Sequence, residues 1–226
     1  MTTRIGLLLF PRLTQLDLTG PYEVFGRLPD TQVLLVGAGE VRSDTGLWLR
    51  PDVGHADAPQ LDVICVPGGP GVNAAMEDDA LLRFLRAQAE RAAWVTSVCT
   101  GALVLGAAGL LRGYRATTHW MSLDLLAAFA ATPVRERVVI DRNRATGGGV
   151  TAGIDFGLRL AAELRGEKVA QAIQLGMEYD PAPPFQAGSP RTADPRLVES
   201  VTAARRGLTD ERRSAVERAA RKLAQQ

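Results

Sequence analysis

Short apolar runs alternate with amphipathic stretches along most of this chain of 226 residues. The apolar runs are rich in valine, isoleucine and leucine, as is typical of strands buried inside a sheet. The stretches between them have helical spacing, as in 79–91, where Leu82, Leu85 and Ala89 fall on one face. This alternation favours an α/β fold, in which a mostly parallel sheet is covered by helices on both faces. The predicted strands are 5–10, 32–36, 47–49, 63–66, 94–98, 116–118, 138–140 and 145–146, and the predicted helices are 21–28, 79–91, 101–111, 123–130, 154–164 and 169–177.

Composition narrows the class of protein. Hydrophobic residues make up 46% of the chain and charged residues 23%, both ordinary for a globular protein, and the net charge is +1. This charge indicates neither a nucleic-acid partner nor a membrane surface. The first apolar run is too short for a signal peptide or a spanning helix, and two distant cysteines do not suggest a disulfide scaffold. We therefore expect a cytoplasmic protein, with no metal because no residue cluster has the spacing of metal ligands.

Cys99 lies where the β-branched run 94–98 passes directly into the Ala- and Leu-rich stretch 101–111. This pattern predicts a strand, a sharp turn and a helix, with the thiol on the turn, and Gly101 suits a turn in which two chain segments approach closely. The free N–H groups and the dipole of the helix would favour a thiolate, so we interpret Cys99 as a reactive nucleophile. The alternative is a buried and inert cysteine, which is our interpretation of Cys65, inside the strand 63–66.

Asp17 is predicted to follow the first strand and to precede the first helix, 21–28. In an open α/β sheet, ligands bind beyond the carboxyl ends of the strands, where Cys99 is also expected. Leucines flank Asp17 on both sides, so its carboxyl group would be partly buried and its pKa raised by desolvation and by a nearby thiolate. Such a group can deliver and take back a proton near neutral pH. The equally weighted alternative is a helix N-cap.

Two glycine-rich segments are expected at the same edge of the sheet. Gly68 and Gly69 follow the strand 63–66, and their backbone N–H groups could face a polarised group, although an ordinary tight turn has the same pattern. The segment 146–149 stands between a strand and a helix, where glycines permit close approach of the backbone. The hydroxyl of Thr100 could hydrogen-bond the sulfur, or Thr100 could be an ordinary first-turn residue. His119 could reach the edge of the site or have a structural role beside Trp120.

The C-terminal part follows an irregular, proline-rich linker, 181–190. From 196 to 226 the pattern is helical, with an apolar stripe that includes Leu197 and Val201, and Thr209 with Asp210 could cap a second helix. Because charges of both signs are interleaved, we favour an amphipathic helix docked on the protein over a nucleic-acid-binding arm. The expected division is a catalytic domain, 1–190, and a helical extension, 191–226, packed on that domain or on a dimer partner.

These motifs resemble the ThiJ/PfpI superfamily, and the resemblance covers residues 4 to 190. The sharp turn between strand and helix that carries Cys99 resembles the nucleophile elbow of the family at 97–101, where Cys99 takes the position of the family nucleophile. The segments 15–21 and 116–120 resemble a branch that contains isocyanide hydratases and the sensor domains of AraC-like transcription regulators. Asp17 and the segments 146–149, 181–185 and 188–190 are particularly similar to isocyanide hydratase.

The resemblance implies a flavodoxin-like three-layer sandwich with a mostly parallel central sheet, and a cofactor-independent homodimer. It implies hydration of isocyanides to N-substituted formamides through a covalent thioimidate on Cys99. Asp17 would act as general acid and base, and Thr100 would steady the thiolate. Backbone groups of Gly68, Gly69, Gly148 and Val150 would contribute to the substrate site.

Two alternatives follow from the same superfamily. The first is another enzymatic activity, such as a glyoxalase-like reaction on carbonyls; the second is a redox-sensing or ligand-binding protein related to the regulator sensor domains. PfpI-type proteases have histidine directly after the nucleophile, where this chain has Thr100. The glyoxalase-like members use a glutamate beside the thiol, where this chain has Asp17.

Overall fold

The computed structural model describes residues 2–225 and is built around a six-stranded sheet. All neighbouring strands in this sheet are parallel, except that the last pair is antiparallel. Five parallel strands therefore end at one edge and direct the loops that follow them to the same side of the molecule. In spatial order the strands are β2 (Thr31–Val36), β1 (Thr3–Leu8), β5 (Val63–Val66), β6 (Trp94–Val98), β10 (Arg144–Gly147) and β9 (Val138–Asp141).

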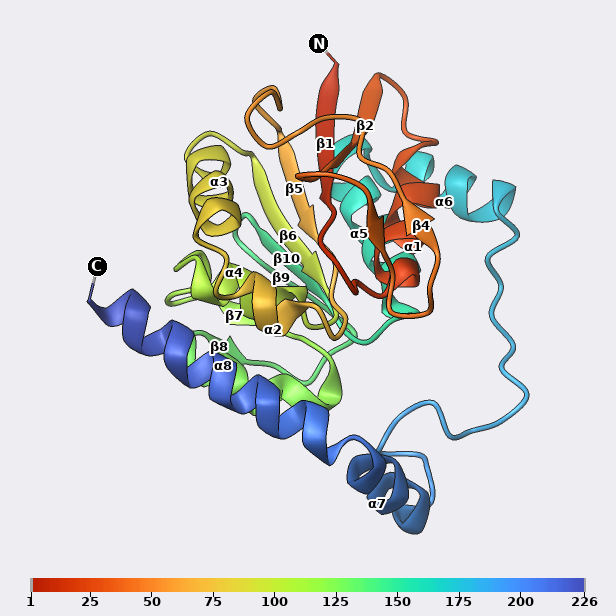
Figure 1. Cartoon of the computed structure of the whole chain (residues 1–226). Coiled ribbons are helices and arrows are strands. Elements are labelled where there is room, and N and C mark those ends of the chain that lie inside the picture. Colours follow the sequence, from red (N-terminus) through yellow and green to blue (C-terminus); the bar gives the residue numbers. More distant parts are fainter. Residues whose placement is uncertain (1, 226) are drawn as a thin grey trace.

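Helices cover both faces of the sheet (Figure 1). One face is covered by α1 (Gln15–Phe25) and α5 (Ala152–Arg165), with α6 (Glu167–Gly176) packed outside α5. The three layers confirm the predicted α/β architecture. The opposite face carries α3 (Asp79–Ala89) and α4 (Gly101–Ala107), next to α2 (Val72–Ala75) and the 3₁₀ helix η1 (Trp120–Phe129). Two small sheets pair β3 (Val41–Arg42) with β4 (Trp48–Leu49) and β7 (Arg115–Ala116) with β8 (Thr132–Pro133).

The structure corrects the boundaries of three predicted helices, and the one predicted at 101–111 ends at Ala107. The first helix begins at Gln15 rather than at Pro21, so Pro21 lies inside it and Asp17 stands on its first turn. The N-cap position is Thr14, which excludes the capping alternative for Asp17. The helix predicted at 123–130 is a 3₁₀ helix that starts three residues earlier, directly after His119, whose Nδ1 accepts a hydrogen bond from the N–H of Met121.

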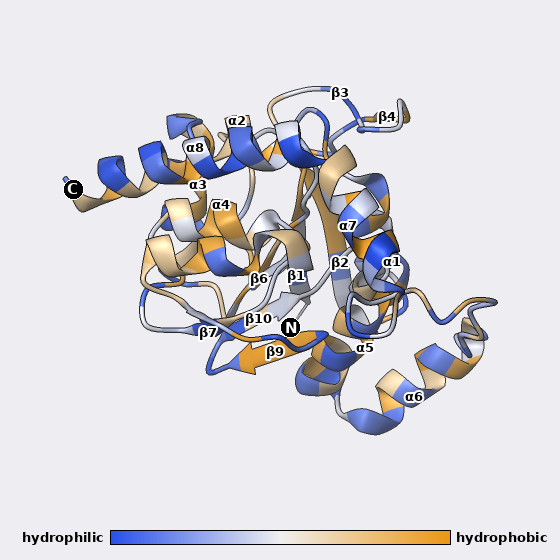
Figure 2. Ribbon diagram, turned by 90° about the horizontal axis from the view of Figure 1, so that it is seen from below, coloured by the Kyte–Doolittle hydropathy of each residue, from blue (hydrophilic) through white to orange (hydrophobic). Residues whose placement is uncertain are grey.

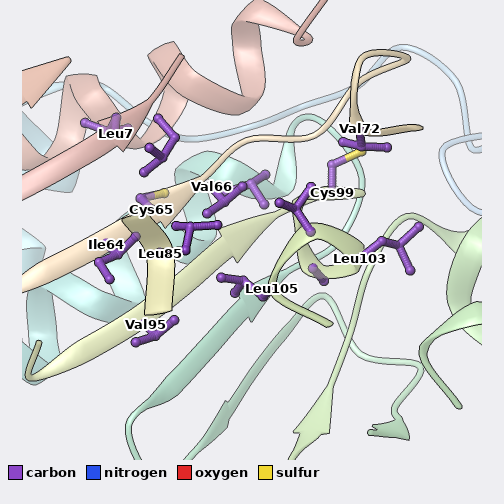
Figure 3. Packing of buried hydrophobic residues seen from close by; sticks show 14 of the residues in the cluster. Leu7, Ile64, Cys65, Val66, Val72, Leu85, Val95, Cys99, Leu103 and Leu105 are labelled. Atoms are coloured by element: carbon purple, nitrogen blue, oxygen red, sulfur yellow. The ribbon is translucent and has the colours of Figure 1, made fainter. Parts of the chain in front are cut away.

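Buried side chains of the central strands and α4 form a continuous hydrophobic core (Figure 3). All four residues of β5 are buried, including Cys65 with no exposed surface, which confirms the interpretation of Cys65 as a core residue. Burial raises the pKa of the Cys65 thiol to about 12. Cys99 belongs to the same cluster but lies just beyond the end of β6, near Val66 and Leu103 (Figure 3).

The C-terminal part forms two helices, α7 (Pro195–Ala204) and α8 (Arg206–Ala224). The second helix begins before Thr209, so the predicted cap at Thr209 and Asp210 is wrong. α8 lies across α2, α4 and η1, and hydrophilic and hydrophobic residues alternate along it (Figure 2). α7 has no buried residue. Among residues 2–225, no helix has the length and apolar character needed to cross a membrane.

Candidate active site

Cys99 occupies a strained turn between β6 and α4. Its φ angle is 54°, in the left-handed region that residues other than glycine seldom adopt. Hydrogen bonds fix this conformation: its N–H donates to the carbonyl oxygens of Gly147 at 3.0 Å and Gly148 at 2.9 Å, and the Thr118 hydroxyl donates to its carbonyl at 2.7 Å. A side chain on Gly101 would clash with the carbonyl of Val66. The predicted strand, turn and helix are therefore present.

Asp17 reaches the same place from the first turn of α1 and has no exposed surface. Its Oδ2 accepts a hydrogen bond of 3.0 Å from the N–H of Gly68. Its Oδ1 is buried and accepts no N–H within residues 2–225, while the carboxyl group shares a hydrogen bond with the Cys99 thiol. Burial raises the pKa of Asp17 to about 7, although the bonds to Cys99 and Gly68 oppose the shift.

The thiol itself differs from the expectation of a thiolate. Burial raises the pKa of Cys99, and the neighbouring Asp17 raises it further. Hydrogen bonds from the backbone N–H groups of Val150 and Thr100 lower the pKa but do not outweigh burial. The favourable effect of the helix N-terminus is real, but desolvation in the packed interior is larger. Asp17 and Cys99 thus form a buried pair in which the carboxyl group, with a pKa about 7, is the group able to exchange a proton near neutral pH.

Thr100 contacts the loop that follows β5 and contains Gly68 and Gly69, here called the β5 loop. The hydroxyl of Thr100 was expected to hydrogen-bond the sulfur, but it binds this loop instead. The Thr100 hydroxyl accepts a hydrogen bond of 3.0 Å from the N–H of Gly69, and it is the backbone N–H of Thr100 that faces the sulfur. A Cβ on Gly68 would lie 2.5 Å from the Thr100 nitrogen and 2.8 Å from Asp17 Oδ2. Only glycine fits between Thr100 and Asp17 at this position, and the N–H groups of the loop bind Asp17 and Thr100.

A cavity of about 440 Å³ adjoins the turn through Gly148 and Val150. His119 lines it too, and a Cβ on Gly149 would lie 2.8 Å from the imidazole Cδ2. Burial lowers the pKa of His119 to about 4, so its imidazole is neutral at physiological pH. His119 therefore lines the cavity as a neutral side chain.

Sequence reasoning missed Arg212, which reaches the site from α8. Its side chain donates hydrogen bonds to the Gly69 carbonyl at 3.2 Å, to Ser122 Oγ at 3.3 Å and to Asn73 Oδ1 at 3.2 Å. A signal was available: Arg212 stands four residues after Leu208 and four before Val216, so a charged residue interrupts an apolar stripe. Among residues 2–225, no cluster of three or more His, Cys, Asp or Glu side chains could hold a metal ion.

A cysteine on a strained turn at the end of a parallel sheet, paired with a buried carboxyl group, defines a protein with a cysteine nucleophile elbow. The chain belongs to the DJ-1/PfpI family, which matches residues 3–163.

Individual relatives extend the similarity beyond those residues. The chain is 56% identical over 225 residues to the isonitrile hydratase of Pseudomonas putida, which covers 99% of both chains. It is 33% identical to the HTH-type transcriptional regulator GbdR of Pseudomonas aeruginosa, but the match covers 78% of this chain and only 50% of the regulator. The crystal structure of a ThiJ/PfpI family protein from Pseudomonas syringae superposes with a TM-score of 0.93 at 43% identity, covering 96% of this chain and 91% of the other.

Proposed function

We propose that this protein is an isonitrile hydratase, which adds water to isonitriles and releases N-substituted formamides without a cofactor. The observation that carries the assignment is the 56% identity to the isonitrile hydratase of Pseudomonas putida along 99% of both chains. The regulators do not offer an equivalent match, because half of their length has no counterpart here. The nucleophile and acid of the elbow supply the chemistry that such a reaction requires.

The first step forms a carbon–sulfur bond. The Cys99 sulfur attacks the terminal carbon of the isonitrile while Asp17 takes the thiol proton and passes it to that carbon, which gives a thioimidate. An acid whose pKa is about 7 can carry out both transfers, since it is partly ionised at neutral pH. The raised pKa of Cys99 means that the thiol loses its proton as it attacks rather than beforehand.

The second step breaks the same bond. Water adds to the thioimidate carbon as Asp17 accepts one of its protons and passes it to the imidate nitrogen. The tetrahedral intermediate then collapses: Asp17 takes the remaining hydroxyl proton as the C=O bond forms, the carbon–sulfur bond breaks, the sulfur receives that proton from Asp17, and the formamide is released. The cavity beside Gly148 and Val150 is the proposed place for the organic group of the substrate.

The test measures, by chromatography, the rate at which the protein releases the formamide from an aryl isonitrile. We expect turnover by the wild-type protein and a loss of about 10⁴-fold or more in Cys99→Ala, because the covalent intermediate cannot form. Cys65→Ala is the matched control, since Cys65 is buried in β5 and should leave turnover intact. Turnover that survives Cys99→Ala would overturn the mechanism, and consumption of methylglyoxal without formamide release would overturn the assignment.

The proposed homodimer concerns α7. This helix has no buried residue, and Leu197 and Val201 are 45% and 38% exposed. Exposed apolar side chains at helical spacing suit a surface covered by a second copy. Light scattering should therefore give the mass of a dimer, and Leu197→Asp should shift it toward a monomer. We also propose a cytoplasmic location, where Cys65 and Cys99, both free, would stay reduced.

A further inference from the structure

Arg212 is a buried cation without a carboxylate partner. Only 5% of its surface is exposed, and none of the ion pairs within residues 2–225 includes it. Its three acceptors are the neutral oxygens of Gly69, Ser122 and Asn73. A buried charge is costly unless an opposite charge compensates it. The positive charge of Arg212 therefore requires a neighbouring group that can become negative.

The nearby groups that can become negative are those of the elbow. Burial lowers the pKa of Arg212, and the charge of Cys99 acts in the opposite direction and raises it. Because the interaction between two charges is reciprocal, a cation that is favoured by the thiolate also favours the thiolate. Burial and Asp17 are the two effects that make Cys99 hard to ionise. The guanidinium of Arg212 is placed to act against them, because it contacts Gly69, which in turn contacts Thr100, the residue next to Cys99.

Arg212 also holds the loop that orients the site. Its guanidinium binds the carbonyl of Gly69, whose N–H donates to the Thr100 hydroxyl. The preceding residue, Gly68, donates its N–H to Asp17. Gly69 has a φ angle of 123°, which only glycine adopts readily, so an outside contact to its carbonyl helps to fix the turn. One side chain of the C-terminal helix therefore contacts the loop that positions the acid and the nucleophile's neighbour.

We propose that Arg212 is a positioning residue that stabilises negative charge on the sulfur of Cys99 and fixes the β5 loop, so that the C-terminal helix α8 completes the active site. The inference rests on the proposed function only for its effect on turnover. Other charged and titratable groups act on this pair: Asp17 from α1, Asp44 through its effect on Asp17, Arg205 before α8, and His119 before η1. Each of these residues is retained in the Arg212 variants.

The test is the rate at which iodoacetamide alkylates Cys99 between pH 6 and 10, measured by mass spectrometry of the modified peptide. Arg212→Met removes the charge, Arg212→Gln removes it but keeps a donor for Gly69, and Arg212→Lys keeps the charge. We expect the methionine and glutamine variants to slow alkylation about tenfold across this range, which lies below the raised pKa of the thiol. The lysine variant should stay close to wild type. The control is Arg218→Gln on the same helix, whose partner is the exposed Glu77.

The proposal is overturned if folded Arg212→Met and Arg212→Gln keep the wild-type alkylation rate, or if Arg212→Lys slows alkylation as much as they do. If the methionine variant does not fold, the glutamine and lysine variants decide by the same criterion. The alkylation assay contains no isonitrile, so it separates this inference from the proposed function. The value of kcat/KM for isonitrile hydration should fall in the same variants and in the same order as the alkylation rate.

Discussion

Two buried charged side chains reach the elbow from opposite ends of the chain, and they bind adjacent residues of one loop. Asp17, on α1, accepts the N–H of Gly68, whereas Arg212, on α8, donates to the carbonyl of Gly69. They differ in how they respond to burial, which raises the pKa of Asp17 to about 7 and lowers that of Arg212 without neutralising a guanidinium. One group exchanges protons near neutral pH, and the other remains a fixed charge.

The two side chains also differ in whether they lie within the residues that match the family. Asp17 and Cys99 lie inside the match to the DJ-1/PfpI family at residues 3–163, and Arg212 lies outside it. The similarity to the isonitrile hydratase, in contrast, runs through 225 residues and includes α8. The charge of Arg212 therefore comes from outside the residues matched to the family, and through Gly69 it reaches Thr100, next to Cys99.

Of the two side chains, Asp17 exchanges protons, and replacing it should have the largest effect on turnover. We expect Asp17→Asn to lower kcat by roughly 10²–10⁴-fold, because the amide can neither take the thiol proton nor deliver it to carbon. Wild-type turnover should rise as pH increases through about 7, where Asp17 ionises, and this rise should be absent from the variant. The measurement is formamide release between pH 5 and 9. Asp124→Asn, at an exposed position of η1, is the control.

A variant that keeps full turnover and the same pH dependence would show that Asp17 is not the acid and that the proton comes from elsewhere. Comparison with Arg212→Met then becomes the sharper test. Arg212→Met should lower turnover but keep the rise with pH that Asp17 causes, whereas Asp17→Asn should abolish that rise.

The second effect concerns stability and has a definite sign. The pKa of Asp17 is about 7 in the folded protein against an ordinary 3.8, so between these values the folded state keeps a proton that the unfolded state releases. The contribution of Asp17 to the free energy of unfolding should therefore be greatest below pH 3.8 and should fall as pH rises to about 7. Asp17→Asn removes this cost, which is on the order of 4 kcal/mol when fully developed.

Urea denaturation of both proteins at pH 5 and pH 8 measures this difference. The stability of Asp17→Asn relative to wild type should increase with pH. A difference that is the same at both pH values would mean that the carboxyl group is not neutral in the folded protein at the lower pH.

The sequence predicted the part of the site whose causes are local. The β-branched run before Cys99 and the Ala-rich run after it determine the strand, the turn and the helix, and these lie where they were expected. The start of the first helix was predicted incorrectly because Pro21 is typical of a first turn, whereas here the helix packs tightly against α5 and tolerates proline inside.

Properties that depend on distant segments could not be obtained from the sequence in this way. The pKa of Cys99 is raised because α4 and the surrounding loops exclude water and because Asp17 lies beside it, neither of which follows from residues 94–105. Arg212 is 143 residues from Gly69 in the chain. Only the docking of α8 on α2, α4 and η1 brings the two together.

The smallest expected effects are on the free energy of unfolding and come from the contacts that hold α8 against the protein. The position of Arg212 depends on these contacts. Val216 is 1% exposed and packs in the core, whereas Arg218, on the same helix, forms an exposed ion pair with Glu77. We expect Val216→Ala to lower the free energy of unfolding by about 1–3 kcal/mol, through lost burial and a small cavity. Arg218→Gln should leave the denaturation midpoint nearly unchanged, because exposed ion pairs in water contribute little and are screened by salt. If Arg218→Gln cost as much as Val216→Ala, and if salt reduced that cost, charge rather than apolar packing would hold α8 against the site.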